Sequence, residues 1–350
     1  MSKGIGIIGC GRIAQVRHIP ELSANDRCHI VGYFNPTRSR AESMATVYGG
    51  KVYDSVEGML EDTDVEGVVV CLANSAHAEV SVKALLAGKD VLCEKPMATS
   101  LGECERMMEA ARRSRRLLLI AQNQRLSPAH TLAKELIEGG AIGRVLSFRT
   151  TFGHSGPENC SISPGKDTWF FRKDTAVMGV MADLGVHKTD LIQYLLGCNV
   201  VGVSSSLCTL DKTGPDGAAV KVDDNAICIF RMESGAVGTM TSSWTYYGWE
   251  DNSTIIYGTE GQLRIYDCLE SPLRLVYRDG SFKDFHTPSI QTNSSQSSSG
   301  MADYFVEALY SRDGGILSAE RVLPAMRAVF AAIESSQRGA YIPIPENYRR

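Results

Sequence analysis

The chain has 350 residues, of which 43% are hydrophobic and 22% charged, and its formal net charge is −4 at pH 7. Single hydrophobic cores stop growing near ~250–300 residues, so this length predicts two domains. The acidic balance argues against nucleic acid as a partner. No apolar run approaches a membrane span, and no signal-peptide pattern opens the chain, so we expect a cytoplasmic protein without membrane contact.

Short apolar runs alternate with helical patterns in the first third of the chain. Such alternation predicts a parallel sheet wound with helices on both faces, an α/β fold, which we place at residues 1–122. The expected strands are 4–9, 29–35, 67–73, 90–93 and 117–121, and the expected helices are 13–23, 38–48, 76–87 and 101–113.

The pattern changes after about residue 124, where several strands follow one another without helices between them. A run of this kind predicts a large, mainly antiparallel sheet with one face on helices and the other free for a partner. We expect residues 123–350 to form an α+β domain for substrate binding and for assembly into a homodimer or homotetramer through its sheet. Its last helices could pack back on the first domain. The expected strands are 145–152, 200–208, 225–232, 237–244, 252–257, 262–266 and 274–277, and the expected helices are 132–138, 178–196, 303–310 and 320–337.

A glycine-rich segment, residues 9–14, follows the first strand and opens the first helix. It matches GxGxxG/A, the fingerprint of the Rossmann dinucleotide-binding fold, and its context is the one the fingerprint requires. Gly9 allows the tight turn, and Gly11 lets the backbone approach a pyrophosphate. Arg12 and Ile13 then stand at a helix N-terminus, whose N–H groups attract phosphate.

The end of the second strand bears on the choice between NAD and NADP. The fingerprint expects an acidic residue there to hold the ribose 2′-hydroxyl, but Asn35 occupies the position and Arg38 and Arg40 follow. Asparagine would not repel a 2′-phosphate, and the arginines could pair with it. The pattern slightly favours NADP over NAD; a solvated helix start is the other interpretation of the arginines.

A Glu-Lys-Pro sequence ends the strand at 90–93, at the carboxyl edge where ligands bind in such sheets. Lys95 stands directly before Pro96, which restricts its backbone. A lysine held at a cofactor crevice is a candidate electrophile or acid.

With these motifs the chain resembles the glucose–fructose oxidoreductase and inositol dehydrogenase family, Gfo/Idh/MocA, nearly end to end. The resemblance implies an NAD(P)-dependent oxidoreductase that moves a hydride between nicotinamide and a secondary alcohol or ketone of a sugar, cyclitol or sugar derivative. In that family the lysine at the Lys95 position touches substrate and nicotinamide, and the Lys95–Pro96 bond is expected to be cis. The matching segments are 9–14, 84–96, 140–143, 183–190 and 258–261.

Asp183, His187 and Asp190 are spaced to share one face of a predicted helix. A solvated polar face is one interpretation. A metal site is another, but no third His or Cys lies at ligand spacing, so we expect none. The resemblance favours an acid–base cluster: His187 as the base, Lys95 as a clamp on the substrate oxygen, and Asp183 as the residue that orients the substrate. Which of Asp183 and His187 accepts the proton stays open.

The resemblance adds further candidates. Trp169 could instead belong to an aromatic core cluster, and His77 to a helix surface. Beyond the residues named above, the expected cofactor contacts are Leu72, Ala73, Asn74, His77, Glu94 and Asn123, and the expected substrate contacts are Arg125, His154, Trp169 and Arg172.

One segment departs from the family pattern. Relatives often carry three consecutive glycines before the Asp–His helix, whereas residues 176–179 read Ala-Val-Met-Gly. Two other functions remain possible on this fold: an NAD-dependent, redox-assisted glycosidase, and a non-catalytic NAD(P)-binding regulator. The regulator is disfavoured because such proteins typically lack the lysine or the histidine.

Overall fold

The computed structural model describes residues 2–162, 164–268, 270–288, 290, 296 and 298–345. The chain forms two compact units. The first comprises Met1–Asn123, Cys160–Ser163 and Gln291–Leu323. The second comprises Gln124–Asn159, Pro164–Ile290 and Pro324–Arg350.

The first unit is built on a six-stranded sheet in the order β3-β2-β1-β4-β5-β6. Every pair of neighbours in it is parallel, which confirms the predicted doubly wound sheet. The central strands are buried along their length, as expected when both sheet faces are covered. The strands are β1 (Lys3–Ile8), β2 (Cys28–Phe34), β3 (Lys51–Val52), β4 (Gly67–Val70), β5 (Asp90–Cys93) and β6 (Leu118–Ile120).

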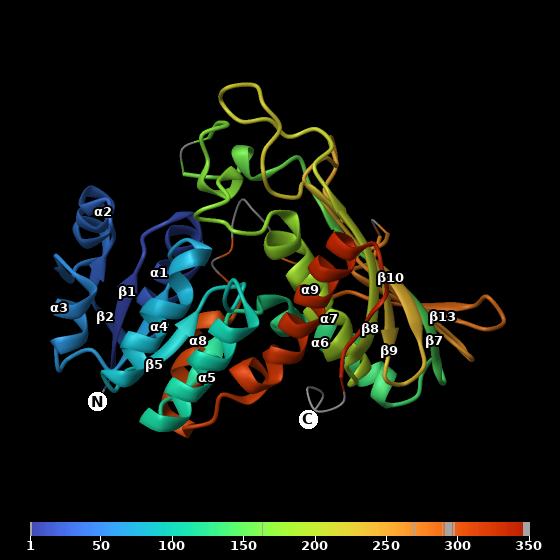
Figure 1. The fold of residues 1–350 in the computed structure, drawn as a ribbon. Helices are drawn as coiled ribbons and strands as arrows, with labels where there is room; N and C mark the ends of the chain where they lie inside the picture. The colour runs from blue at the N-terminus through green and yellow to red at the C-terminus, as the bar shows by residue number, and fades with distance from the viewer. Residues whose placement is uncertain are drawn as a thin grey trace. The chain divides into compact units, whose positions relative to one another are not determined.

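Helices cover both faces of this sheet (Figure 1). The chain moves one way across the sheet after β1 and the other way after β4, so right-handed crossovers place the two groups of helices on opposite faces. One group pairs α4 with α5, and the other pairs α1 with α8. The helices are α1 (Ile19–Ser23), α2 (Arg38–Tyr48), α3 (Val56–Glu61), α4 (His77–Leu86), α5 (Leu101–Ser114) and α8 (Met301–Ser311).

The second unit is built on a nine-stranded sheet in the order β14-β13-β12-β11-β7-β10-β9-β8-β15. The predicted antiparallel character is confirmed, although the central strands β7 and β10 pair in parallel. The strands are β7 (Val145–Gly153), β8 (Val200–Cys208), β9 (Asn225–Met232), β10 (Val237–Ser243), β11 (Thr254–Gly258), β12 (Gly261–Ile265), β13 (Leu273–Tyr277), β14 (Phe282–Phe285) and β15 (Ile342–Pro343).

One face of the second sheet packs on helices. These are α6 (Pro128–Glu138), α7 (Val186–Leu196) and the part of α9 (Ala319–Arg338) that belongs to this unit. α7 packs on β7, and the hydroxyls of Ser335 and Ser336 in α9 accept bonds from the backbone of β8. Burial alternates along β9, with every second side chain on the open face.

Two functional helices contain π-helical turns that the sequence did not predict. The helix after the glycine-rich loop runs from residue 12 to 23 and is π-helical over Ala14–His18. The helix that carries Asp183 and His187 runs from residue 180 to 196 and is π-helical over Met181–Gly185. Such turns are rare and recur at functional sites.

Candidate functional site

The glycine-rich loop has the geometry of a phosphate cradle. Gly9 has φ +102°, and a Cβ there would lie 2.5 Å from the Cys71 carbonyl oxygen, so no other residue fits. A Cβ on Gly11 would meet only that oxygen, at 3.8 Å, which leaves room for a ligand to approach the backbone. The segment therefore fits a dinucleotide pyrophosphate at the carboxyl ends of β1 and β4.

Asn35 is buried and its amide supports the loop. Its Oδ1 accepts from the Cys10 backbone N–H at 2.9 Å, and its Nδ2 donates to the Thr37 carbonyl oxygen at 2.9 Å. A carboxylate could accept the first bond but could not donate the second. The two hydrogen bonds thus explain why an asparagine occupies position 35, which the sequence alone did not reveal.

The two arginines after Asn35 differ in their surroundings. Arg38 is exposed and pairs with Glu42 at 2.8 Å and with Asp54. Arg40 is half-buried, and its charge slightly opposes the burial that raises the pKa of the Cys10 thiol to about 12. Arg38 is therefore occupied by carboxylates, whereas the charge of Arg40 lies within electrostatic range of Cys10 in the loop.

Glu94, at the end of β5, is a buried junction between β5 and the helix that follows the glycine-rich loop. Its carboxylate contacts His18 Nε2 at 2.7 Å and Arg17 Nη1 at 3.3 Å, and it accepts from the Lys95 backbone N–H at 3.1 Å. Burial raises the pKa of Glu94. The hydrogen bond to His18 and the charges of His18, Arg17 and Lys95 have the larger, opposite effect and lower the pKa to about 2. No sequence pattern pointed to Arg17 and His18 as partners of Glu94.

His77 joins the ends of β4 and β5. Its Nδ1 lies 2.8 Å from the Pro96 carbonyl oxygen and its Nε2 lies 3.0 Å from the Leu72 carbonyl oxygen. Both acceptors call for an N–H on each nitrogen, which is the imidazolium form. Burial lowers the pKa of His77, but Cys93 and the two backbone bonds raise it more, to about 9.

We therefore expect the free energy of unfolding to depend on this proton. The pKa rises from 6.5 to about 9 on folding, so the folded state holds the proton more tightly, with an effect of about 3 kcal/mol. This stabilisation is complete below pH 6.5 and is lost as the pH rises to 9. Urea unfolding of His77→Gln should show a pH dependence smaller by that amount, whereas His29→Gln, at an exposed histidine, should behave as the wild type.

The other cofactor candidates of the first unit lie at the same carboxyl edge. Leu72, Ala73 and Asn74 follow β4, and Asn123 follows β6. Lys95 is half-buried after β5, and the Lys95–Pro96 bond is cis, as expected. The exposed Arg12 and half-buried Ile13 begin the helix after the loop.

In the second unit, His154 and His187 both contact one aromatic ring, that of Phe152. The Phe152 ring centroid is 6.0 Å from that of His187 and 6.1 Å from that of His154. The His154 backbone N–H donates to the Ser243 carbonyl oxygen in β10 at 3.0 Å. The two histidines predicted for substrate binding thus belong to one cluster.

Asp183 lies in the π-helical turn and accepts from Trp244 Nε1 at 3.0 Å. Asp190 does not join Asp183, because it forms a buried two-pronged pair with Arg125, from Nε at 2.7 Å and Nη2 at 2.6 Å. The expected Asp–His–Asp face is therefore divided. Two donors of Arg125, which is predicted to contact substrate, are occupied by Asp190.

Lys188, next to His187, is fully buried and was not predicted to matter. Its Nζ donates to the Asn252 carbonyl oxygen at 2.9 Å and lies 5.9 Å from the Phe152 ring centroid. Burial lowers the pKa of Lys188 to about 7, while Asp251 and Glu250 oppose this effect. A buried lysine with a lowered pKa thus lies near the aromatic ring that both histidines contact.

Aromatic rings surround Trp244. Trp169 is half-buried and stacks on Phe170 with centroids 4.0 Å apart, and Phe170 meets Trp244 edge-on at 6.4 Å. Trp169 is thus connected to Asp183 indirectly, through the rings of Phe170 and Trp244. Arg172 is exposed and pairs with Asp167 at 2.6 Å.

The segment that replaces the three glycines keeps one left-handed residue. Val177 has φ +63°, which is strained for a β-branched side chain. A Cβ on Gly179 would lie 1.9 Å from the Asp223 carbonyl oxygen, so this glycine is required. The Asp223 carboxylate accepts from the Gly179 and Met181 N–H groups and anchors the start of the helix that carries Asp183.

Within the described residues, no group of His, Cys, Asp and Glu is arranged to hold a metal ion. The same residues include no helix with the length and apolar character needed to cross a bilayer. All ten cysteines carry free thiols.

Comparisons with known proteins agree with both units. The oxidoreductase family with an NAD-binding Rossmann fold (GFO_IDH_MocA) matches residues 3–122, and the GFO/IDH/MocA C-terminal domain matches residues 130–264. Levoglucosan dehydrogenase from Pseudarthrobacter phenanthrenivorans is 34% identical over 224 residues, 59% of this chain and 56% of that protein. The 1,5-anhydro-D-fructose reductase of Ensifer adhaerens is 30% identical over 262 residues, 74% of each chain.

A solved structure shares the whole fold. A levoglucosan dehydrogenase in complex with NADH and levoglucosan superposes with a TM-score of 0.86 at 24% identity, and the match covers 99% of this chain and 100% of that one. The likeness shows that the two units share the fold of that structure. The chain belongs to the Gfo/Idh/MocA oxidoreductase family. The first of the two relatives above matches over little more than half its length.

Proposed function

We propose that the protein oxidises a secondary alcohol, or reduces the matching ketone, of a sugar, cyclitol or sugar derivative with NAD(P). The observation that carries this proposal is that a chain of this family retains both Lys95, after the Rossmann strand β5, and His187, in the histidine cluster of the second unit. Relatives named for acting on sugars support the substrate class.

The roles follow from the chemistry of the side chains. NAD(P) held at the glycine-rich loop would accept the hydride from the alcohol carbon, or supply it to the ketone carbon. His187 takes the hydroxyl proton, because an imidazole titrates near neutrality. Asp183 orients the substrate hydroxyl, held in place by Trp244. Lys95 stabilises the negative charge that develops on the substrate oxygen. Asp183 is the alternative proton acceptor.

A substrate panel tests the function. Purified protein is incubated with sugars, anhydrosugars and inositols, each with NAD and with NADP, and turnover is followed at the nicotinamide absorbance. We expect turnover of at least one polyol with one cofactor. Cofactor binding without turnover across the panel would favour the non-catalytic regulator, and release of a leaving group without net NADH would favour the redox-assisted glycosidase.

For the cofactor we propose NADP, held at its 2′-phosphate by Arg40. Asn35 brings no negative charge to this position, the charge of Arg40 lies within electrostatic range of Cys10 in the loop, and Arg38 is paired with Glu42 and Asp54. Arg40→Ala should raise the KM for NADP about tenfold or more, the effect of losing a charge-assisted bond, and leave the KM for NAD unchanged. Arg38→Ala is the matched control. A wild type that prefers NAD would reject the proposal.

We also propose self-association through the open face of the second sheet. Ile227 and Ile229 of β9 are 57% and 50% exposed, Val237 of the adjacent β10 is 40% exposed, and Tyr257 of β11, beyond β7, is 37% exposed. Ile229 pairs with Thr239 and Val237 with Ser147, which puts these apolar side chains on one face. Exposed apolar patches of this kind mark protein interfaces. Sedimentation velocity at micromolar concentration should show a dimer or tetramer, and a monomer would contradict the proposal.

A cytoplasmic location is proposed as well. The ten free cysteines support it, because thiols persist in reducing compartments. Fractionation of cells that make the full-length protein tests this location.

A further inference from the structure

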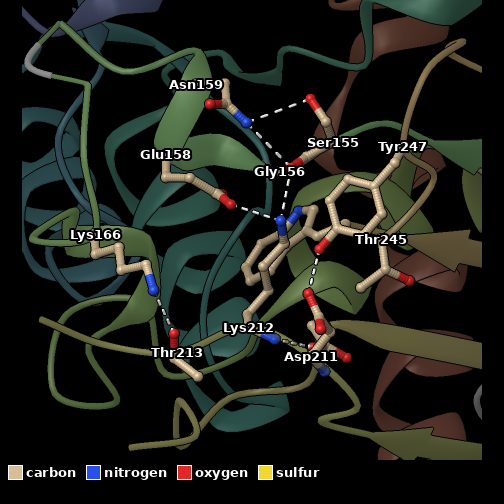
Figure 2. Close-up of polar contacts among 12 residues, drawn as sticks. Ser155, Gly156, Glu158, Asn159, Lys166, Asp211, Lys212, Thr213, Thr245 and Tyr247 are labelled. Carbon is tan, nitrogen blue, oxygen red and sulfur yellow. Dashed lines mark hydrogen bonds and ion pairs between the residues drawn. The ribbon is translucent and has the colours of Figure 1, made fainter. Parts of the chain in front are cut away.

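Three loops meet at one edge of the second sheet. β10 is parallel to β7, and β8 and β10 are both antiparallel to β9, so all three strands point the same way. The segments that follow them, 154–159, 209–213 and 245–247, therefore lie at the same edge (Figure 2). His154 belongs to the first of these segments.

Lys212 lies at the centre of the three loops. Its side chain is 5% exposed, and its Nζ donates to the Ser155 carbonyl oxygen at 2.6 Å and pairs with Glu158 Oε1 at 2.5 Å. The Tyr247 ring covers the ammonium group, with its centroid 4.8 Å from Nζ (Figure 2). A buried cation with three partners from two other loops fixes those loops relative to each other.

The backbone of Lys212 is held as firmly as its side chain. The buried Asp224 carboxylate accepts from the N–H groups of Leu210, Asp211 and Lys212, each at 2.8 Å. The Tyr247 hydroxyl donates to Asp211. The backbone that carries the Lys212 side chain is thus held in place by Asp224, directly before β9.

One peptide group connects Lys212 to His154. The Ser155 carbonyl that accepts from Lys212 and the Gly156 N–H belong to the same amide, and that N–H donates to His154 Nδ1 at 3.0 Å. Gly156 has φ +108°, and a Cβ there would lie 2.8 Å from Lys212 Nζ, so the turn requires glycine. A cation at the carbonyl polarises the amide and strengthens its N–H as a donor.

We propose that Lys212 is a positioning residue that fixes the ring orientation and the tautomer of His154. A nitrogen that accepts a backbone N–H carries a lone pair, so the proton of the neutral imidazole resides on Nε2. His154 is then a hydrogen-bond donor and not a second base beside His187. This inference rests on the proposed function, which gives His154 a substrate oxygen to contact.

The division of labour follows from this geometry. Both imidazoles contact Phe152, with their ring centroids 6.1 Å and 6.0 Å from its own. His187 is left to take the proton, while the Nε2–H of His154 is aimed by a network that contains no group of the acid–base trio. A polyhydroxylated substrate needs such fixed donors to select one hydroxyl for reaction.

The tautomer can be measured in the full-length protein. Protein labelled with ¹⁵N-histidine is examined by NMR at a pH where His154 is neutral, and His154→Gln identifies its signals. We expect an unprotonated Nδ1 and a protonated Nε2. Lys212→Met should give mixed tautomers, Lys212→Arg should restore the wild-type pattern, and Lys166→Met should leave it unchanged. Lys166 is the matched control because it binds Thr213 in the same loop cluster without touching the Ser155–Gly156 peptide.

The kinetics give a second readout. Lys212→Met should raise the KM for the substrate about tenfold, the effect of one misplaced hydrogen bond, with a much smaller change in kcat. If that variant does not fold because Glu158 is left unpaired, the double variant Lys212→Met/Glu158→Gln removes both charges. A proton on Nδ1 in the wild type, or an unchanged tautomer without Lys212, would overturn the proposal.

The spectra need no substrate, so the two proposals fail separately. If the protein turns over no polyol but shows the expected tautomers, the proposed function is contradicted and the positioning role of Lys212 stands. If the protein oxidises sugars but His154 is protonated on Nδ1, the positioning role of Lys212 is contradicted and the proposed function stands.

Discussion

Lys95→Ala is expected to lower kcat by about a thousandfold while the Kd for the dinucleotide changes little. The alanine removes the only cation assigned to the developing negative charge on the substrate oxygen, and the loss of one such donor costs 10²–10³ or more in rate. The cradle around Gly9 and Gly11 is untouched, so cofactor binding is retained. Stopped-flow turnover and fluorescence titration of the reduced cofactor measure the two quantities.

Two controls separate chemistry from structure in this test. Lys95 also contributes to the low pKa of Glu94, so Lys95→Arg keeps that charge but cannot reproduce the compact ammonium. It should be as inactive as the alanine variant. Lys83→Ala, at an exposed lysine in surface ion pairs on α4, should retain full activity. Full turnover in Lys95→Ala would refute the mechanism.

Asp190→Ala is expected to lower the free energy of unfolding by about 3–5 kcal/mol, because it leaves the Arg125 guanidinium buried without its carboxylate. Arg125 is 4% exposed and Asp190 is 1% exposed, so water cannot replace the lost partner. Burial raises the pKa of Asp190 in spite of the Arg125 charge and hydrogen bond. For Asp190, the effect of burial on the pKa is therefore larger than the opposing effect of Arg125.

The double variant Arg125→Met/Asp190→Leu should recover most of that loss. Replacing a buried ion pair by apolar side chains of similar size is often neutral or stabilising. Urea unfolding of Arg125→Met, Asp190→Leu and the double variant gives the coupling energy. Additive losses would show that the pair is not the unit of stability, and a double variant that is stable but inactive would point to a substrate contact by Arg125.

Local patterns predicted the strands and the glycine-rich loop well, because their signals lie within a few residues. β8 and β9 begin and end where expected, at Val200–Cys208 and Asn225–Met232. The short polar strand β14 was missed because its sequence, Phe-Lys-Asp-Phe, has too little apolar character to stand out from a turn. The π-helical turns were missed because no composition separates them from an α-helix.

Partners across the fold could not be predicted in the same way. Glu94 was expected to contact the cofactor, but its partners Arg17 and His18 lie 77 and 76 residues away in the chain. Lys212 stands in a sequence typical of a polar turn, Asp-Lys-Thr-Gly, and its burial follows from three strands ending at one edge. Charge pairs of this kind are set by topology, which a single sequence does not reveal.

The central position of β7 has a consequence for how the protein is made. Residues 145–153 pair with 237–243 on one side and with 254–258 on the other. At roughly 5–20 residues per second, a nascent β7 waits several seconds on the ribosome with both edges unsatisfied. Open strand edges recruit other chains, so holdase chaperones should bind this segment during translation. Synonymous changes that slow translation between codons 154 and 236 should reduce the soluble yield without altering the finished protein.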